Sequence, residues 1–156
     1  MINDKALLQR TIDLASEGIR KGNGPFGAVI VKDGKIIAEA SNSVVLSNDP
    51  TAHAEVLAIR KAAEILTSHD LSDCTLFSSC EPCPMCLGAI YWAGIKNVIY
   101  ASDRLEAAKA GFNDNFIYDE ITLAPSERSI SFIHRPNAGG EIVFKKWNDF
   151  EGKVQY

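Results

Sequence analysis

The chain has 156 residues, 46% of them hydrophobic, and its formal net charge is -4. This length suffices for one substantial core, so we expect a single domain over residues 1–156. The negative charge disfavours general attraction to nucleic acid or to anionic membranes. The N-terminal stretch MINDKALLQRTIDLASEG lacks a long apolar run, so we expect no signal peptide or membrane span and a cytoplasmic location.

The first predicted element is a helix over residues 3–21. Its apolar side chains recur every three or four residues, as on a helix with one buried face; they are Leu8, Ile12, Ala15 and Ile19. The next segment, FGAVIVKDGKIIAEA, has two β-rich runs around Asp33-Gly34. Because this dipeptide tolerates positive φ, it favours a tight hairpin of antiparallel strands.

From Ala52 onwards, helical patterns alternate with short strands. A second helix is indicated by Val56, Ile59, Ala63 and Leu66. The strand CTLFSS follows, then a helix over residues 84–93 and the strand NVIYA. This alternation predicts βαβ crossovers.

The last third of the sequence has weaker patterns. We expect a helix near residues 105–110, an irregular GFNDNF segment, a strand ISFIH, and a terminal helix containing Val143, Trp147 and Phe150. Together the elements predict an α/β fold, a three-layer α/β/α sandwich around a mixed sheet of about five strands.

Three residues have the types and spacing of a zinc site. Cys83 and Cys86 stand three residues apart on the first turn of a predicted helix, whose N-terminal dipole favours thiolates. His53 can supply a third ligand at the start of another helix. On a helix His53 and Glu55 would point about 160° apart, so both can serve one site only if the helix end faces the metal.

Three protein ligands leave the fourth tetrahedral position of one zinc ion for water, as in catalytic zinc sites. Glu55 beside the ligand His53 could then take a proton from that water and return it to a leaving group. A structural zinc site does not need such a carboxylate. The pattern therefore favours a catalytic centre.

The cysteines also allow two other kinds of metal site. Cys80 could close a four-ligand structural zinc site. An iron–sulfur cluster on this run of cysteines calls for a fourth cysteine at the position that Ile90 occupies. We assign His69, His134 and Cys74 to the surface or the core.

The motifs HAE and PCPMC match the H-x-E and P-C-x-x-C signature of zinc nucleobase deaminases. The chain resembles the cytidine-deaminase superfamily over most of its length. The segments GPFGAVIV, NDPTAHAEVLAIRKA, SCEPCPMCLGAIYWA and AGFNDNFIY are most similar to bacterial guanine deaminases. The resemblance implies that His53, Cys83 and Cys86 bind zinc, that Glu55 shuttles protons, and that the fold is an α/β/α sandwich.

For the substrate, the resemblance implies guanine, hydrolysed to xanthine and ammonia. Guanine offers N–H donors at N1 and at its 2-amino group, which one carboxylate can accept as a pair. Asp114 is the candidate carboxylate, and it either binds the base alone or also passes a proton alongside Glu55.

The resemblance also places Asn42 on the base and Phe26 and Trp92 at its walls. The alternative from the residues alone is that Asp114 and Asn42 are turn residues and that the two aromatic residues belong to the core.

Three rival functions stay open. A transfer-RNA adenosine deaminase shares the zinc signature but needs a cationic surface, for which the sequence offers only Lys145, Lys146 and Lys153. Cytosine or nucleoside deamination is a second alternative. A domain in which zinc is purely structural, serving as an interaction module, is a third.

The C-terminal segment suggests a homodimer. The apolar stripe of the terminal helix must pack on something, and the preceding RPNAGGE is a plausible hinge. Bacterial guanine deaminases, which the chain resembles, form dimers with exchanged C-terminal segments, and this implies exchange of about residues 141–156. Tyr156 would then reach the partner's pocket. The alternative is a frayed tail without a role.

Overall fold

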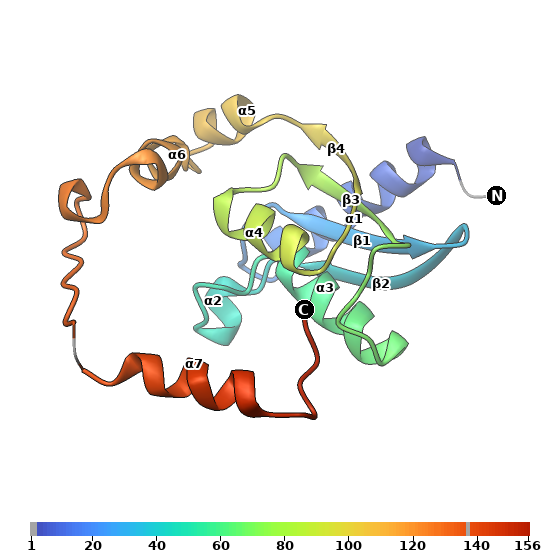
Figure 1. Ribbon diagram of the computed structural model, residues 1–156. Coiled ribbons are helices and arrows are strands. Elements are labelled where there is room, and N and C mark those ends of the chain that lie inside the picture. Colours follow the sequence, from blue (N-terminus) through green and yellow to red (C-terminus); the bar gives the residue numbers. More distant parts are fainter. Residues whose placement is uncertain (1–2, 137) are drawn as a thin grey trace. The chain divides into compact units, whose positions relative to one another are not determined.

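The computed structural model describes residues 3–136 and 138–156, and the chain divides into two units, Met1–Asp114 and Asn115–Tyr156. The first unit contains, in order, α1 (Asp4–Arg20), β1 (Gly27–Lys32), β2 (Lys35–Ser41), α2 (Val44–Ser47), α3 (Ala54–Leu66), β3 (Thr75–Cys80), α4 (Pro84–Trp92), β4 (Asn97–Ser102) and α5 (Arg104–Lys109) (Figure 1). The second contains α6 (Asn115–Thr122), a short 3-10 helix (Pro125–Glu127) and α7 (Gly140–Asp149).

The first unit is built on a mixed four-stranded sheet with the order β2-β1-β3-β4. β1 is antiparallel to both β2 and β3, whereas β3 and β4 are parallel and joined through α4. Asp33 and Gly34 both have positive φ, at 51° and 71°, and form the predicted hairpin turn. The α/β class, the hairpin and the βαβ crossover are confirmed.

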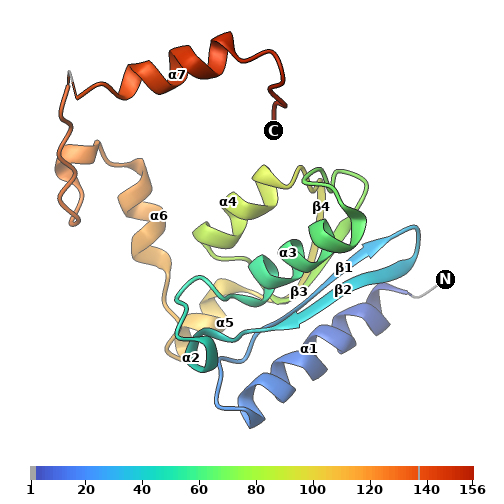
Figure 2. The same ribbon diagram turned by 90° about the horizontal axis from the view of Figure 1, so that it is seen from below.

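Helices cover both faces of this sheet (Figure 2). Alternate residues of β1 face opposite sides, so that Val29 and Val31 pack with Leu7 and Leu14 of α1. On the other face, a larger cluster joins the sheet to α3 and α4; its members include Ala28, Ile30, Leu76, Ala54, Ala58, Ala62 and Ile90. The small alanines of α3 let the helix lie close to the strands. The expected three-layer arrangement is confirmed.

The first helix has the predicted bounds because both ends are capped. The side chain of Asn3 accepts a hydrogen bond from the backbone N–H of Ala6 at 2.9 Å, and Lys21 is the C-terminal cap. Arg10 joins the helix to β2 through two hydrogen bonds to the carboxylate of Glu39, at 2.8 and 2.7 Å. These contacts fix α1 on the hairpin.

The expectation of five strands is wrong, because residues 130–134 do not form one. The segment has strand-forming residues, but a strand also needs a hydrogen-bonded neighbour. Its apolar side chains Ile130, Phe132 and Ile133 stay exposed.

The prediction that GFNDNF is irregular is wrong for its last two residues, because Asn115 and Phe116 begin α6. The predicted hinge, residues 135–141, includes Asn137, which lies outside the described residues. Within the second unit, α7 is helical as predicted and buries none of its residues. No helix among the described residues is long and apolar enough to cross a membrane.

Candidate active site and metal centre

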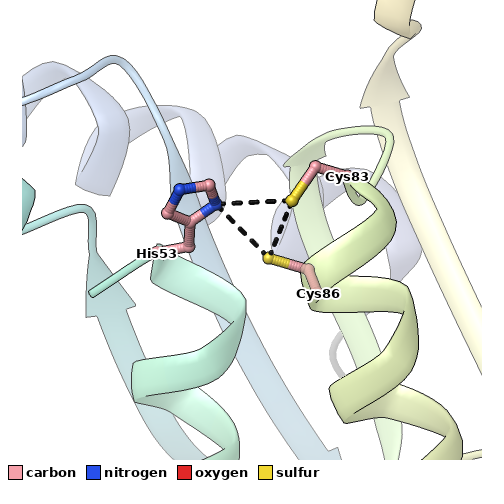
Figure 3. Close-up of side chains that lie close together, drawn as sticks. All are labelled: His53, Cys83 and Cys86. Atoms are coloured by element: carbon pink, nitrogen blue, oxygen red, sulfur yellow. Dashed lines mark hydrogen bonds between the residues drawn. The ribbon is translucent and has the colours of Figure 1, made fainter. Parts of the chain in front are cut away.

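Two helix N-termini present the predicted metal ligands. His53 is the N-terminal cap of α3 and Cys83 is the cap of α4, both with extended backbone, and Cys86 lies one turn into α4. Pro84 starts α4, where its missing N–H costs no hydrogen bond. Because His53 precedes the helix, its side chain reaches over the helix end towards the two sulfur atoms (Figure 3). This is the end-on arrangement that the sequence required.

The spacing of the three ligand atoms fits a tetrahedral zinc site. Nδ1 of His53 lies 3.5 Å from each sulfur, and the two sulfur atoms are 3.5 Å apart. Ideal Zn–N and Zn–S bonds at tetrahedral angles place nitrogen and sulfur about 3.6 Å apart, and two sulfur atoms about 3.8 Å apart. One imidazole and two thiols therefore stand within a few tenths of an ångström of the positions that zinc requires.

The charges at this cluster also suit a divalent cation. Contacts with Cys86 and with His53 lower the pKa of Cys83 to about 4, although burial opposes this shift. Contact with Cys83, burial and the carboxylate of Glu55 all raise the pKa of Cys86. The protein alone thus favours one thiolate. The second can ionise when a cation such as Zn²⁺ neutralises the added charge.

Glu55 is the buried carboxylate beside this cluster. Its side chain is 4% exposed, and Oε2 lies 3.4 Å from Sγ of Cys86. The other oxygen, Oε1, accepts a hydrogen bond from the hydroxyl of Ser78 at 3.0 Å. Burial raises the pKa of Glu55, which favours its binding of a proton. A carboxylate so placed can carry a proton between groups at the metal centre.

Cys80 takes no part in the group of possible metal ligands found among the described residues, which consists of His53, Cys83 and Cys86. Its sulfur instead contacts the carbonyl oxygen of Asp103 at 3.6 Å. A four-ligand structural site closed by Cys80 therefore does not form. The three-ligand set leaves one tetrahedral position to water or substrate.

Three of the predicted base-binding residues, Asp114, Phe26 and Asn42, belong to the first unit. Burial and the charge of Cys83 raise the pKa of Asp114, which places this carboxyl within electrostatic range of the ligands. The ring of Phe26 packs edge-on against Phe112, with centroids 4.9 Å apart, two residues before Asp114. Asn42 is 5% exposed and its backbone N–H donates to the carbonyl of Phe26 at 2.9 Å. Phe26 thus connects Asn42 with the loop that carries Asp114.

Comparison with known proteins shows the family of this chain. The model of the cytidine and deoxycytidylate deaminase zinc-binding region matches residues 1–102. The chain belongs to this deaminase family. It is 54% identical to the guanine deaminase of Bacillus subtilis (strain 168), over 99% of this chain and 100% of that protein.

An X-ray structure of the Bacillus subtilis guanine deaminase superposes on this deaminase with a TM-score of 0.97 and covers 99% of both chains. A transfer-RNA-specific adenosine deaminase of Aquifex aeolicus (strain VF5) is 44% identical over 70% of this chain and 72% of its own. The deaminase thus resembles enzymes with different substrates, at different extents of coverage.

The two remaining predicted base-binding residues of the deaminase lie at the end of α4 and in the second unit; they are Trp92 and Tyr156. Trp92 ends α4, a helix of nine residues, so about 13 Å of helix separates it from the end capped by Cys83. Its side chain is 70% exposed. That Trp92 forms a wall of the base pocket therefore stays a prediction. Tyr156 belongs to the second unit and is considered below.

Ser78 is a residue of the deaminase site that the sequence did not reveal. It lies in the buried strand β3 and is 1% exposed. The available signal was the pair Ser78-Ser79 at the end of an otherwise apolar strand, just before the ligand segment. Buried hydroxyl groups need hydrogen-bond partners, and here the partner is Glu55.

Proposed function

We propose that this protein is a zinc-dependent deaminase that hydrolyses guanine to xanthine and ammonia. The observation that carries the proposal is its similarity over the whole chain to the Bacillus subtilis guanine deaminase. The buried carboxylate beside three metal ligands supports the hydrolytic chemistry. A closed structural zinc site does not need a proton-carrying carboxylate beside its ligands. The presence of Glu55 therefore disfavours a pure interaction module.

In this proposal His53, Cys83 and Cys86 hold the metal. Zinc held there would supply the Lewis acidity that makes a water molecule a nucleophile at neutral pH. Glu55 takes the proton of the attacking water and donates it to a ring nitrogen, which makes the adjacent carbon more electrophilic. Glu55 then takes the second water proton, from the hydroxyl group now on C2, and delivers it to the 2-amino group, so that ammonia departs rather than an amide anion and a carbonyl forms at C2.

Asp114 supplies the proposed discrimination for guanine. A carboxylate can accept both N1–H and a 2-amino N–H, whereas cytosine presents a carbonyl and adenine has no donor at C2. Asn42 and Phe26 complete the proposed base-binding set. Phe26 offers an aromatic face, and the amide of Asn42 offers both a donor and an acceptor.

Asp114→Asn is expected to lower kcat/KM for guanine by roughly 10²-fold, because the amide presents a donor to the N–H groups of the base. Ammonia release from guanine, measured beside zinc content, checks this. Asp119→Asn, a change on α6 in the second unit, is the matched control and should retain activity. Guanine turnover at the wild-type rate in Asp114→Asn would refute this mode of recognition.

Transfer RNA is the main rival substrate, and the surface charges disfavour it. The net charge is -4. Lys145 forms an ion pair with Asp149 at 2.7 Å, and Lys153 donates to the carbonyl of Asn148 at 2.6 Å. Each of these two ammonium groups thus already has a partner within the second unit. Measuring ammonia release from free bases, nucleosides and transfer RNA in parallel separates the rivals, and we expect guanine to be the preferred substrate.

We further propose a homodimer in which residues 141–156 are exchanged between subunits. The support is that α7 has an apolar face yet buries no residue. In its apolar stripe of Val143, Trp147 and Phe150, Val143 and Phe150 are more than half exposed, and such a face is normally covered. In the exchanged dimer Tyr156 contributes to the base pocket of the partner.

Exchange predicts complementation between two defective chains. Tyr156→Ala and Glu55→Gln are each expected to impair guanine turnover. A mixture that exchanges subunits should recover activity, because one site of each heterodimer then combines an intact Glu55 with an intact Tyr156. Differently tagged chains verify that heterodimers form. Absence of recovery in verified heterodimers would place Tyr156 in the site of its own chain.

A further inference from the structure

Ser78 occupies a rigid position in the centre of the sheet. It pairs with Ala28 of β1 on one side and with Tyr100 of β4 on the other. The hydrogen bonds of two neighbouring strands fix its backbone, and its side chain is 1% exposed. The hydroxyl group is therefore presented from a part of the protein that has little freedom to move.

The hydrogen bonds of this hydroxyl group have a defined direction. The backbone N–H of Cys80 lies 3.4 Å from Oγ of Ser78. An amide N–H can only donate, so Oγ is the acceptor in this hydrogen bond. The single hydroxyl proton then points to Oε1 of Glu55, at 3.0 Å. The second carboxylate oxygen, Oε2, lies 3.4 Å from Sγ of Cys86. One oxygen is thus held by the sheet, and the other faces the ligand cluster.

This division matters because the last torsion of a glutamate side chain is broad and roughly two-fold. Nothing in the side chain itself keeps Oε2 directed at the metal centre. Proton transfer requires the carboxylate within hydrogen-bond reach of the reacting groups, and small displacements reduce the rate steeply. A fixed donor at Oε1 removes this freedom.

We propose that Ser78 is a positioning residue, which holds Oε1 of Glu55 and thereby aims Oε2 at the metal centre. The proposal rests on the guanine deamination proposed above. Ser78 touches neither the ligand atoms nor the base in this role, and its effect on the reaction passes entirely through Glu55.

The kinetic test compares three variants on the same strand. Ser78→Ala should bind zinc fully and lower kcat by about 10-fold to 100-fold, with KM changed less than about twofold. Ser78→Thr keeps the hydroxyl group and should recover most of the rate. Ser79→Ala is the matched control, because the Ser79 hydroxyl accepts from the backbone N–H of Gly27 at 3.0 Å. It should lower Tm and leave kcat unchanged.

A double mutant separates positioning from general damage. In the Glu55→Gln background, Ser78→Ala should reduce the residual rate no further, because the group through which it acts is already lost. A further loss as large as in the wild-type background would overturn the proposal. If Ser78→Ala does not fold, Ser78→Cys, which has similar size and a weaker donor, replaces it with the same expected direction.

A crystal structure of zinc-loaded Ser78→Ala supplies a readout that needs no turnover. We expect the Glu55 carboxylate to be rotated, or to occupy two orientations, while the three ligands stay in place. An unchanged carboxylate would overturn the proposal. Because this measurement uses no substrate, it remains decisive even if guanine proves not to be the substrate.

Discussion

Replacing Glu55 with glutamine is expected to lower the rate of guanine deamination by roughly 10²-fold to 10⁴-fold while zinc stays bound. Glutamine has nearly the same shape and can still accept from Ser78, so the fold should be retained. It cannot take up and release the proton that the reaction moves. Single-turnover rates and metal analysis of the same preparation check both parts of this expectation.

The matched control for this substitution is Glu64→Gln, an exposed residue on the same helix, α3. It removes one negative charge without reaching the metal centre and should keep the wild-type rate. If Glu55→Gln turned over guanine within a fewfold of wild type, the proton carrier would have to be another group.

Removing either cysteine ligand is expected to abolish stoichiometric zinc binding. Cys83→Ala and Cys86→Ala each leave two protein ligands, which do not hold zinc firmly against dialysis, and activity should be lost with the metal. Zinc per chain, measured after dialysis against a weak chelator, checks this. The two thiols contact His53 at the same distance of 3.5 Å, so we expect both variants to lose zinc alike.

Cys80→Ala is the control for this experiment. Cys80 is buried like Cys86, but its sulfur contacts a carbonyl oxygen of Asp103 rather than the ligand cluster. It should therefore retain zinc and activity, with at most a modest loss of stability. Equal loss of zinc in all three variants would mean a closed four-ligand site and would contradict a catalytic role for the metal.

Local patterns predicted the first unit well because local interactions decide its elements. The side chain of Asn3 caps α1 where its apolar stripe begins, and Asp33-Gly34 adopts the positive φ angles that its hairpin needs. The ligand motifs sit at helix starts, which is where end-on binding requires them. Short-range sequence signals sufficed for these features.

The errors concern partners that are distant in sequence. Strand propensity in residues 130–134 could not reveal that no strand pairs with them. The place of Trp92 in the base pocket stays a prediction from similarity, since Trp92 ends α4, about 13 Å of helix from the end capped by Cys83. Ser78 was overlooked because its role depends on Glu55, 23 residues earlier in the chain. Contacts between residues so far apart in the sequence can be recognised only once the strands and helices are arranged in three dimensions.

The product formed from guanine decides whether this protein is a guanine deaminase. The zinc-loaded protein, incubated with guanine, should form xanthine and ammonia in equal amounts, and Glu55→Gln prepared in parallel should form neither at a comparable rate. Adenosine in transfer RNA and free cytosine should release far less ammonia under the same conditions. Ammonia from transfer RNA or cytosine, with guanine recovered unchanged, would contradict the proposed function.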